Sequence, residues 1–404
     1  MKSIAAKYVA FLRQPHVARL LTVGLVSRMP IGMVGFSMLM FLREALGNFA
    51  LAGTAVGVCF VSMAAAGPIV GRAIDQLGPR KPLFVTGVVQ PLALFGVWLS
   101  ADRGAPYGVV LAFAALSGVF ASPITTLTRT IWRNLFEREE DRRTAFALDS
   151  VTIEINFTLG PAVVAGVLAL ASPRAAFALA IAVVVMAYLV YLGSGVLALF
   201  RRVETQERHL LGPLTEPRLW LVFITIFGTC LCFGLCEVGY PAYGTFRVDA
   251  AMGGVLLALN AMGSAVGGAI YGGMHFKAPV ERQYAVAMAI MGVPLLLHAL
   301  FLEPAWFFAA VAFLLGVFIA PTITAHSVLV SRFAPAKYAT EAFTWSSTFI
   351  VSGLGAGMAL GGALVENAGL RPAFAAGAAT MAAMSLAAFV LMSPRSPQTV
   401  RAGD

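Results

Sequence analysis

Twelve long apolar segments alternate with short polar connections along this chain. Each is close to the roughly 20 residues that a helix needs to cross the hydrocarbon layer of a bilayer. The segments run over residues 17–42, 48–71, 82–101, 106–131, 144–171, 174–200, 217–243, 250–274, 283–302, 304–331, 340–366 and 371–392. Their residues do not alternate as strands of an outer-membrane barrel would, and backbone groups in lipid must be satisfied internally. The pattern predicts twelve transmembrane helices.

The composition restricts the class of protein further. Hydrophobic residues make up 59% of the 404 residues and charged residues only 12%, against about a quarter charged in an ordinary soluble domain. So few polar side chains cannot cover a water-soluble globule of this size. A soluble enzyme, a nucleic-acid-binding protein and a disordered chain are therefore excluded. An all-α polytopic membrane protein fits.

The basic residues predict the orientation. If the N-terminus is cytoplasmic, five of the 28 Lys and Arg residues fall on the outer side, and Arg28 and Arg129 lie within apolar segments. The outer five are Arg43, Arg103, Arg174, Arg247 and Arg371. This bias follows the positive-inside rule, so both termini are expected in the cytoplasm. The net charge of +9 is then a topology signal and not a nucleic-acid footprint. The first segment is too long for a signal-peptide core, and we expect it to be retained.

Three short stretches of the first half recur in order in the second half, at an offset of 198 or 197 residues. The pairs are 118–123 (GVFASP) with 316–321 (GVFIAP), 144–146 with 341–343, and 174–177 with 371–374. This predicts two similarly oriented halves, residues 1–200 and 217–404, joined by a cytoplasmic linker over residues 201–216. Two such bundles suit alternating access around a central site, which indicates a secondary transporter. No Walker-type phosphate loop is present, which disfavours an ATP-driven pump.

The most specific motif lies between the second and third segments, where residues 71–81 read GRAIDQLGPRK. The positions that carry the pattern are Gly71, Asp75, Gly78, Arg80 and Lys81. This stretch resembles the cytoplasmic loop signature of the major facilitator superfamily. The resemblance implies two six-helix bundles related by a pseudo-twofold axis along the membrane normal. It also implies that Asp75 caps the start of the eleventh helix and helps to hold the outward-facing state. That role is physically reasonable, because a carboxylate is stabilised at a helix N-terminus.

The loop has an alternative interpretation as an ordinary basic turn. Gln76 and Pro79 also replace residues that are more often basic in the family, so the charge network is expected to be thinner. If the family resemblance holds, Gly71 permits close helix approach and Gly78 permits the tight turn.

Glycine motifs also mark the fifth and eleventh segments. Gly160-Pro161, with Gly166 downstream, resembles part of the antiporter signature of the same family, although Val164-Ala165 stand where paired glycines are expected. A helix kink with close packing is an equally good interpretation. The glycines of the eleventh segment recur at every fourth residue: Gly353, Gly357 and Gly361. This face is expected to pack helices closely, at a surface that could slide.

Two charged residues fall close to the middle of the bilayer. At a rise of about 1.5 Å per residue, Arg28 in the first segment and Glu154 in the fifth lie at similar depth. Intramembrane charges are costly and therefore indicate function. Our hypothesis is that Arg28 and Glu154 face each other or share the central cavity, where Glu154 binds protons. The alternative is a static ion pair that fixes helix packing.

A second acidic residue precedes Glu154 in the fifth segment. Helical spacing places four residues on one stripe: Asp149, Ile153, Asn156 and Gly160. Two of them, Asp149 and Asn156, are candidates for contact with substrate or for proton coupling. Arg129, near the inner end of the fourth segment, is the natural partner of Asp149. We expect a structural or gating salt bridge between them.

Further candidates lie in the second half. Glu237 in the outer part of the seventh segment could bind protons or substrate, or mark the aromatic belt of the interface. His326 could line the cavity or stay packed and neutral, and His298 is expected at a peripheral or interfacial position. The apolar candidates for the cavity wall are Met29, Met33, Phe36, Met38, Met40, Phe223, Phe227 and Phe233. Such walls adapt to varied apolar ligands. The four cysteines are expected to be small packing residues.

Together these features predict a secondary transporter of a bacterial-type inner membrane that exports an amphipathic or hydrophobic organic compound in exchange for protons. The alternatives are a sugar or metabolite exporter, a proton symporter for an organic anion drawn to Arg28, and, more distantly, a non-transporting sensor. We expect a monomer in contact with membrane lipids. No enzyme activity, cofactor, metal ion or nucleic acid is expected, because no catalytic or metal-ligand constellation is evident in the sequence.

Overall fold

The computed structural model describes residues 11–136, 138–200, 215–274, 276–335 and 339–391, and the regular structure in these ranges is helical. The first half contains α2 (Val17–Ser27), α3 (Pro30–Leu46), α4 (Phe49–Leu77), α5 (Arg80–Asp102), α6 (Tyr107–Val119), α7 (Ile124–Leu135), α8 (Glu139–Leu170), α9 (Pro173–Gly193) and the 3₁₀ turn η1 (Val196–Leu199). The second half contains α10 (Pro217–Arg247), α11 (Ala250–Gly273), α12 (Val280–Leu300), α13 (Ala305–Val317), α14 (Ile319–Phe333), α15 (Ala339–Ala368) and α16 (Leu370–Leu391). Most of the predicted linker, residues 201–214, lies outside the described residues.

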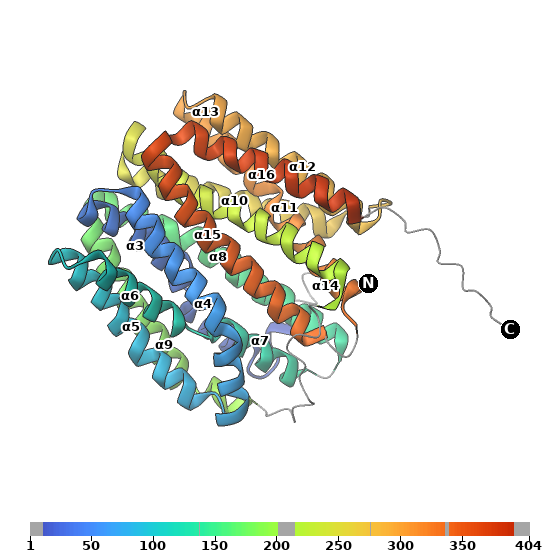
Figure 1. Ribbon diagram of the computed structural model, residues 1–404. Coiled ribbons are helices and arrows are strands. Elements are labelled where there is room, and N and C mark those ends of the chain that lie inside the picture. Colours follow the sequence, from blue (N-terminus) through green and yellow to red (C-terminus); the bar gives the residue numbers. More distant parts are fainter. Residues whose placement is uncertain (1–10, 137, 201–214, 275, 336–338, 392–404) are drawn as a thin grey trace.

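The described chain contains 12 candidate membrane spans, which confirms the predicted number. Successive spans cross in alternate directions. We call the side with the connection 78–79 the inner end and the side with the connection 47–48 the outer end, following the orientation that the basic residues predict. Figure 1 shows the first half, in blue to green, lying beside the second half, in yellow to red.

Three spans are each built from two helices, where the sequence predicted continuous ones. The first span breaks at Arg28 and Met29, between α2 and α3. The fourth breaks over residues 120–123, between α6 and α7, and the tenth at Phe318, between α13 and α14. Prolines at 30, 123 and 321 lie in or beside the breaks, since proline removes a helical donor and crowds the preceding turn.

The recurring stretch 118–123 and 316–321 marks the same local structure in both halves. Gly118 lies directly against the backbone carbonyl of Cys59 in α4, and Gly316 lies against that of Asn260 in α11. A Cβ at either glycine would overlap that carbonyl. The two copies of the stretch therefore make the same kind of glycine–carbonyl contact within their own halves, as a pseudo-twofold relation requires.

Glycine pairs hold corresponding helices together within each half. A Cβ added at Gly160 of α8 would lie 2.6 Å from the Cα of Gly32 in α3. A Cβ added at Gly357 of α15 would lie 2.9 Å from the Cα of Gly234 in α10. Gly353 and Gly361 also contact α10, so the predicted packing role of this glycine face is confirmed, and the face lies inside the second half.

The halves contact each other through α4 with α15 and through α8 with α11. Gly53 and Gly57 in the outer part of α4 lie against the backbone of α15, around Met358 and Gly355. Gly254, at the outer start of α11, lies against the carbonyl of Pro161. Farther inward along α4, no atom of the described residues lies within 4 Å of the position that a Cβ would take at Gly67. The halves are thus in contact at the outer end.

Candidate functional site

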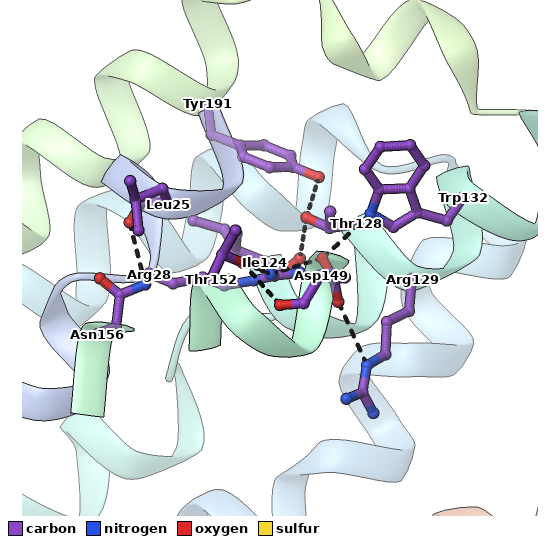
Figure 2. A network of polar contacts seen from close by, with 10 residues as sticks. All are labelled: Leu25, Arg28, Ile124, Thr128, Arg129, Trp132, Asp149, Thr152, Asn156 and Tyr191. Carbon is purple, nitrogen blue, oxygen red and sulfur yellow. Dashed lines mark hydrogen bonds and ion pairs between the residues drawn. The ribbon is translucent and has the colours of Figure 1, made fainter. Parts of the chain in front are cut away.

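Arg28 lies at the break between α2 and α3 and is only 1% exposed. Its Nη1 donates hydrogen bonds to Asp149 Oδ1 of α8 at 2.7 Å and to Thr152 Oγ1 at 3.2 Å (Figure 2). The Thr152 hydroxyl in turn donates to the Asp149 carbonyl, 2.7 Å away. A guanidinium in this dry site needs a counter-ion, and Asp149 supplies it.

Asp149 is also contacted by two residues of α7. The indole Nε1 of Trp132 donates to its Oδ1 at 3.1 Å, and Arg129 Nε lies 3.6 Å from its Oδ2 (Figure 2). The side chain of Arg129 is 54% exposed, whereas that of Asp149 is 2% exposed. The expected contact between Arg129 and Asp149 is therefore present. Asp149 thus lies between the buried guanidinium of Arg28 and the exposed guanidinium of Arg129.

The structure differs from the expected pairing of Arg28 with Glu154. Arg28 pairs with Asp149, because Asp149, Thr152 and Asn156 share the face of α8 that meets the first span. Glu154 lies five residues after Asp149, about 140° around the helix at 3.6 residues per turn. Its partly exposed side chain makes no hydrogen bond or ion pair with any residue that the structure describes.

Asn156 has a structural task in the same network. The break after α2 leaves the Leu25 carbonyl without a helical donor, because the amide of Met29 bonds to Val26 and Pro30 has none. Asn156 Nδ2 donates to this carbonyl at 3.1 Å (Figure 2). The amide side chain thus satisfies an orphan acceptor at a helix end.

Several buried polar atoms of this network form no hydrogen bond with the described residues. Arg28 Nε and Nη2, Asn156 Oδ1 and Asp149 Oδ2 are buried without a hydrogen-bond partner among the described residues. Nearby, Tyr191 of α9 and Thr128 of α7 share a hydrogen bond of 3.1 Å (Figure 2). The cluster thus draws on α2, α7, α8 and α9, and it depends on Asp149 for its charge balance.

Glu237 of α10 is the acidic candidate of the second half. Its side chain is partly exposed and forms no hydrogen bond or ion pair within the described part of the chain. Phe233, one turn earlier, is partly exposed, and Pro241, one turn later, contacts Gly253 at the outer end. Among the described residues, Glu154 of the first half and Glu237 of the second are thus partly exposed intramembrane carboxylates without a hydrogen bond or ion pair.

The histidines lie in packed surroundings. His326 is 1% exposed, and its Nε2 lies 2.7 Å from Ser346 Oγ, so it joins α14 to α15 inside the second half. His298 was expected at a peripheral or interfacial position, and it is not peripheral: it is 1% exposed and stacks on Phe374 with ring centroids 5.0 Å apart. It lies on the face of α12 that meets the aromatic residues of α10, α13 and α16.

The apolar candidates divide into two groups. Met29, Phe227 and Phe233 are partly exposed. The others are buried in the protein core: Met33, Phe36, Met38, Met40 and Phe223. The four cysteines are free thiols, and three of them are buried in α10. No group of three or more potential metal ligands occurs among the residues that the structure describes.

The loop motif at the inner end is partly as expected. Gly78 ends α4 with φ of 79°, so the expected tight turn is confirmed. Arg80 and Lys81 are exposed in the first turn of α5. Gly71 was expected to permit close helix approach, but no atom of the described residues lies within 4 Å of the position of its Cβ. Asp75 lies in the last turn of α4, and the described structure does not extend to its side chain.

The Gly160-Pro161 motif lies at two interfaces. Gly160 packs on Gly32 within the first half, and the Pro161 carbonyl faces Gly254 of α11 in the second half. Pro161 lies inside the continuous helix α8, where it removes one backbone hydrogen bond. The close-packing interpretation of this motif is thus confirmed, whereas a role in antiport stays a prediction.

Comparison with known proteins identifies the family and a similar fold. The family model described as "Major Facilitator Superfamily" matches residues 20–301 and 245–404. The fold is similar to that of a solved structure described as a bacterial homologue of the iron transporter ferroportin in the inward-facing state. The TM-score is 0.73 at 15% identity, over 93% of this chain and 98% of the other. No curated protein matches the chain.

Proposed function

Since this chain belongs to the major facilitator superfamily of transporters, we propose that it exports a small amphipathic or hydrophobic organic molecule in exchange for protons. The observation that carries the proposal is the contrast between its intramembrane charges. Arg28 is buried and neutralised by Asp149. Glu154 and Glu237 are partly exposed carboxylates that have no partner among the described residues.

This contrast argues against an organic anion drawn to Arg28 as the substrate, and it supports protons as the coupled ion. An anion drawn to Arg28 would have to reach a 1% exposed side chain and displace Asp149 from it. A carboxylate without a counter-ion in a membrane is costly, and protonation removes that cost. Binding and release of protons at Glu154 and Glu237 would therefore change the free energy of transferring these side chains from water to surroundings that exclude water.

The internal packing supports movement of the halves as rigid bodies. Gly160 with Gly32, and Gly357 with Gly234, bring helix backbones close together inside each half. Repeated units that rock around a central site are the basis of alternating access in this class of carrier. Partly exposed Phe233, one turn from Glu237, offers an apolar contact beside the acidic group, which suits an amphipathic substrate.

We further propose that the protein lies in a bacterial inner membrane with both termini in the cytoplasm, and that it works as a monomer surrounded by lipid. The six-span halves, residues 1–200 and 217–404, are proposed as the two moving units. The basic residues of the inner connections support this orientation.

The proposal is tested with purified protein in liposomes. Ethidium and rhodamine 6G serve as amphipathic cationic probes, and a lumen made acidic supplies the proton gradient. Molecules whose inner end faces the bath should accumulate dye in the lumen, and nigericin should abolish this accumulation. Dye uptake of equal rate with and without the gradient would refute proton coupling. Uptake of neither dye, with gradient-driven uptake of a sugar, would favour the alternative substrate class.

A further inference from the structure

One hydrogen bond at the outer end joins the two halves of the transporter. The backbone amide of Phe49, the first residue of α4, donates to Glu366 Oε2 at 2.8 Å. Glu366 lies in the last turn of α15, in the other half. The bond therefore exists only while the outer ends of α4 and α15 are together.

The start of α4 is well suited to hold a carboxylate. The first amides of a helix have no internal acceptor, and the helix dipole favours negative charge there. Asn48 Oδ1 accepts from the amide of Leu51 at 3.0 Å, which leaves the amide of Phe49 for another acceptor. Glu366 supplies that acceptor from across the interface between the halves.

The side chain of Phe49 is held by the same interface. It is 1% exposed and meets Phe246 of α10 edge to face, with ring centroids 5.4 Å apart. The Phe49 carbonyl lies against Gly362 of α15, one turn before Glu366. Amide, carbonyl and ring of Phe49 thus all contact the second half.

The two helices are related in a reciprocal way. α4 begins at the outer end and carries Asp75 two residues before its last residue, Leu77. α15 begins at the inner end and carries Glu366 two residues before its last residue, Ala368. Because the helices run in opposite directions, each has an acidic residue in its last turn, at the end of the membrane where the other begins.

We propose that Glu366 is the outer latch of the transporter, which caps α4 when the outer end is closed and releases it when that end opens. The family resemblance assigns Asp75 to the inner end, as the cap of the eleventh helix in the outward-facing state. α4 and α15 then exchange carboxylate caps at opposite ends, so that opening one end uncaps one helix while the other is capped. This latch requires neither bound substrate nor protonation of Glu154 or Glu237.

The test measures the distance between the halves at the outer end. Spin labels are placed at Arg103→Cys and Glu303→Cys, which lie in exposed connections of different halves, in full-length protein with its native cysteines replaced and no substrate added. Double electron–electron resonance then gives the populations of short and long distances. A hydrogen bond to a charged group contributes enough that Glu366→Gln should raise the ratio of open to closed outer ends by about tenfold. Glu366→Asp, which keeps the charge, should stay closer to the parent.

Asp249→Asn is the matched control. Asp249 Oδ1 caps α11 at the same end of the molecule, on the Met252 amide at 2.8 Å, but both groups belong to the second half. Its loss should leave the distance distribution unchanged. An unchanged distribution in Glu366→Gln, or an equal shift in Asp249→Asn, would overturn the proposal.

Asp75→Asn tests the reciprocal part. It should lower the ratio of open to closed outer ends, and the double variant Asp75→Asn with Glu366→Gln should return the ratio toward that of the parent. Equal shifts in the same direction in both single variants would refute an exchange of caps. Because no gradient is applied, this outcome is independent of whether the protein exchanges protons.

Discussion

Asp149 receives a hydrogen bond from a buried guanidinium and another from an indole, and it faces a second, exposed guanidinium. The sequence placed Arg28 and Glu154 at the same depth, and depth alone suggested the wrong partner. The stripe of Asp149, Asn156 and Gly160 indicates which face of α8 meets the first span. All three residues face the first span, through Arg28, Leu25 and Gly32 respectively. The direction around the helix, which this stripe gives, decides which carboxylate meets Arg28.

This arrangement predicts a large loss of stability in Asp149→Asn. Removing one partner of a buried ion pair leaves an uncompensated charge and costs about 3–5 kcal/mol. Thermal unfolding in detergent should show a clearly lowered Tm. Glu154→Gln, on the same helix but without a partner among the described residues, is the control and should unfold near the parent temperature. A double variant with Arg28→Met and Asp149→Leu should recover most of the loss. A parental Tm for Asp149→Asn would show that the pair contributes nothing.

The positions of the transmembrane spans could be predicted from the length of the apolar segments. The helix breaks near prolines inside those spans were harder to predict. All 12 spans were located, because a lipid-facing helix needs an uninterrupted apolar run. The breaks of the fourth and tenth spans were missed, since the apolar run continues through them. The prolines of the recurring stretches, Pro123 and Pro321, were the available signal. The repetition of these stretches predicted two related halves, and the prolines in them also indicate a helix break at the same place in each half.

Glycine contacts between elements yield a second prediction. In Gly160→Val the new side chain would overlap the backbone of Gly32, so α3 and α8 must separate. Overpacking of this kind costs about 1–3 kcal/mol, which should lower the Tm and the monodisperse yield in size-exclusion chromatography. Gly166→Val, on the same helix with no atom within 4 Å of its Cβ position, should behave like the parent. Equal stability of the two variants would contradict the observed backbone contact.

The internal sequence repeat predicted that the whole molecule consists of two related halves, and the family match agrees with that architecture. The sequence did not predict which end is closed, because both states use the same helices and differ only in the contacts between halves. Those contacts lie where Gly53, Gly57 and Gly254 let backbones meet at the outer end. The glycines that recur at every fourth residue of α15 face α10. Gly355 and Gly362 lie outside that pattern, on another face of α15, and meet α4.

The most direct test of proton-coupled export separates substrate movement from proton movement in Glu154→Gln and Glu237→Gln. Liposomes are loaded with unlabelled probe and given labelled probe outside at equal pH, which measures exchange alone. A second set has an acid lumen and no internal probe. We expect that at least one variant keeps exchange near the parental rate while gradient-driven accumulation falls more than about tenfold, because a neutral amide cannot release a proton. Parental gradient-driven accumulation in the double variant would contradict the assignment of these carboxylates to proton coupling.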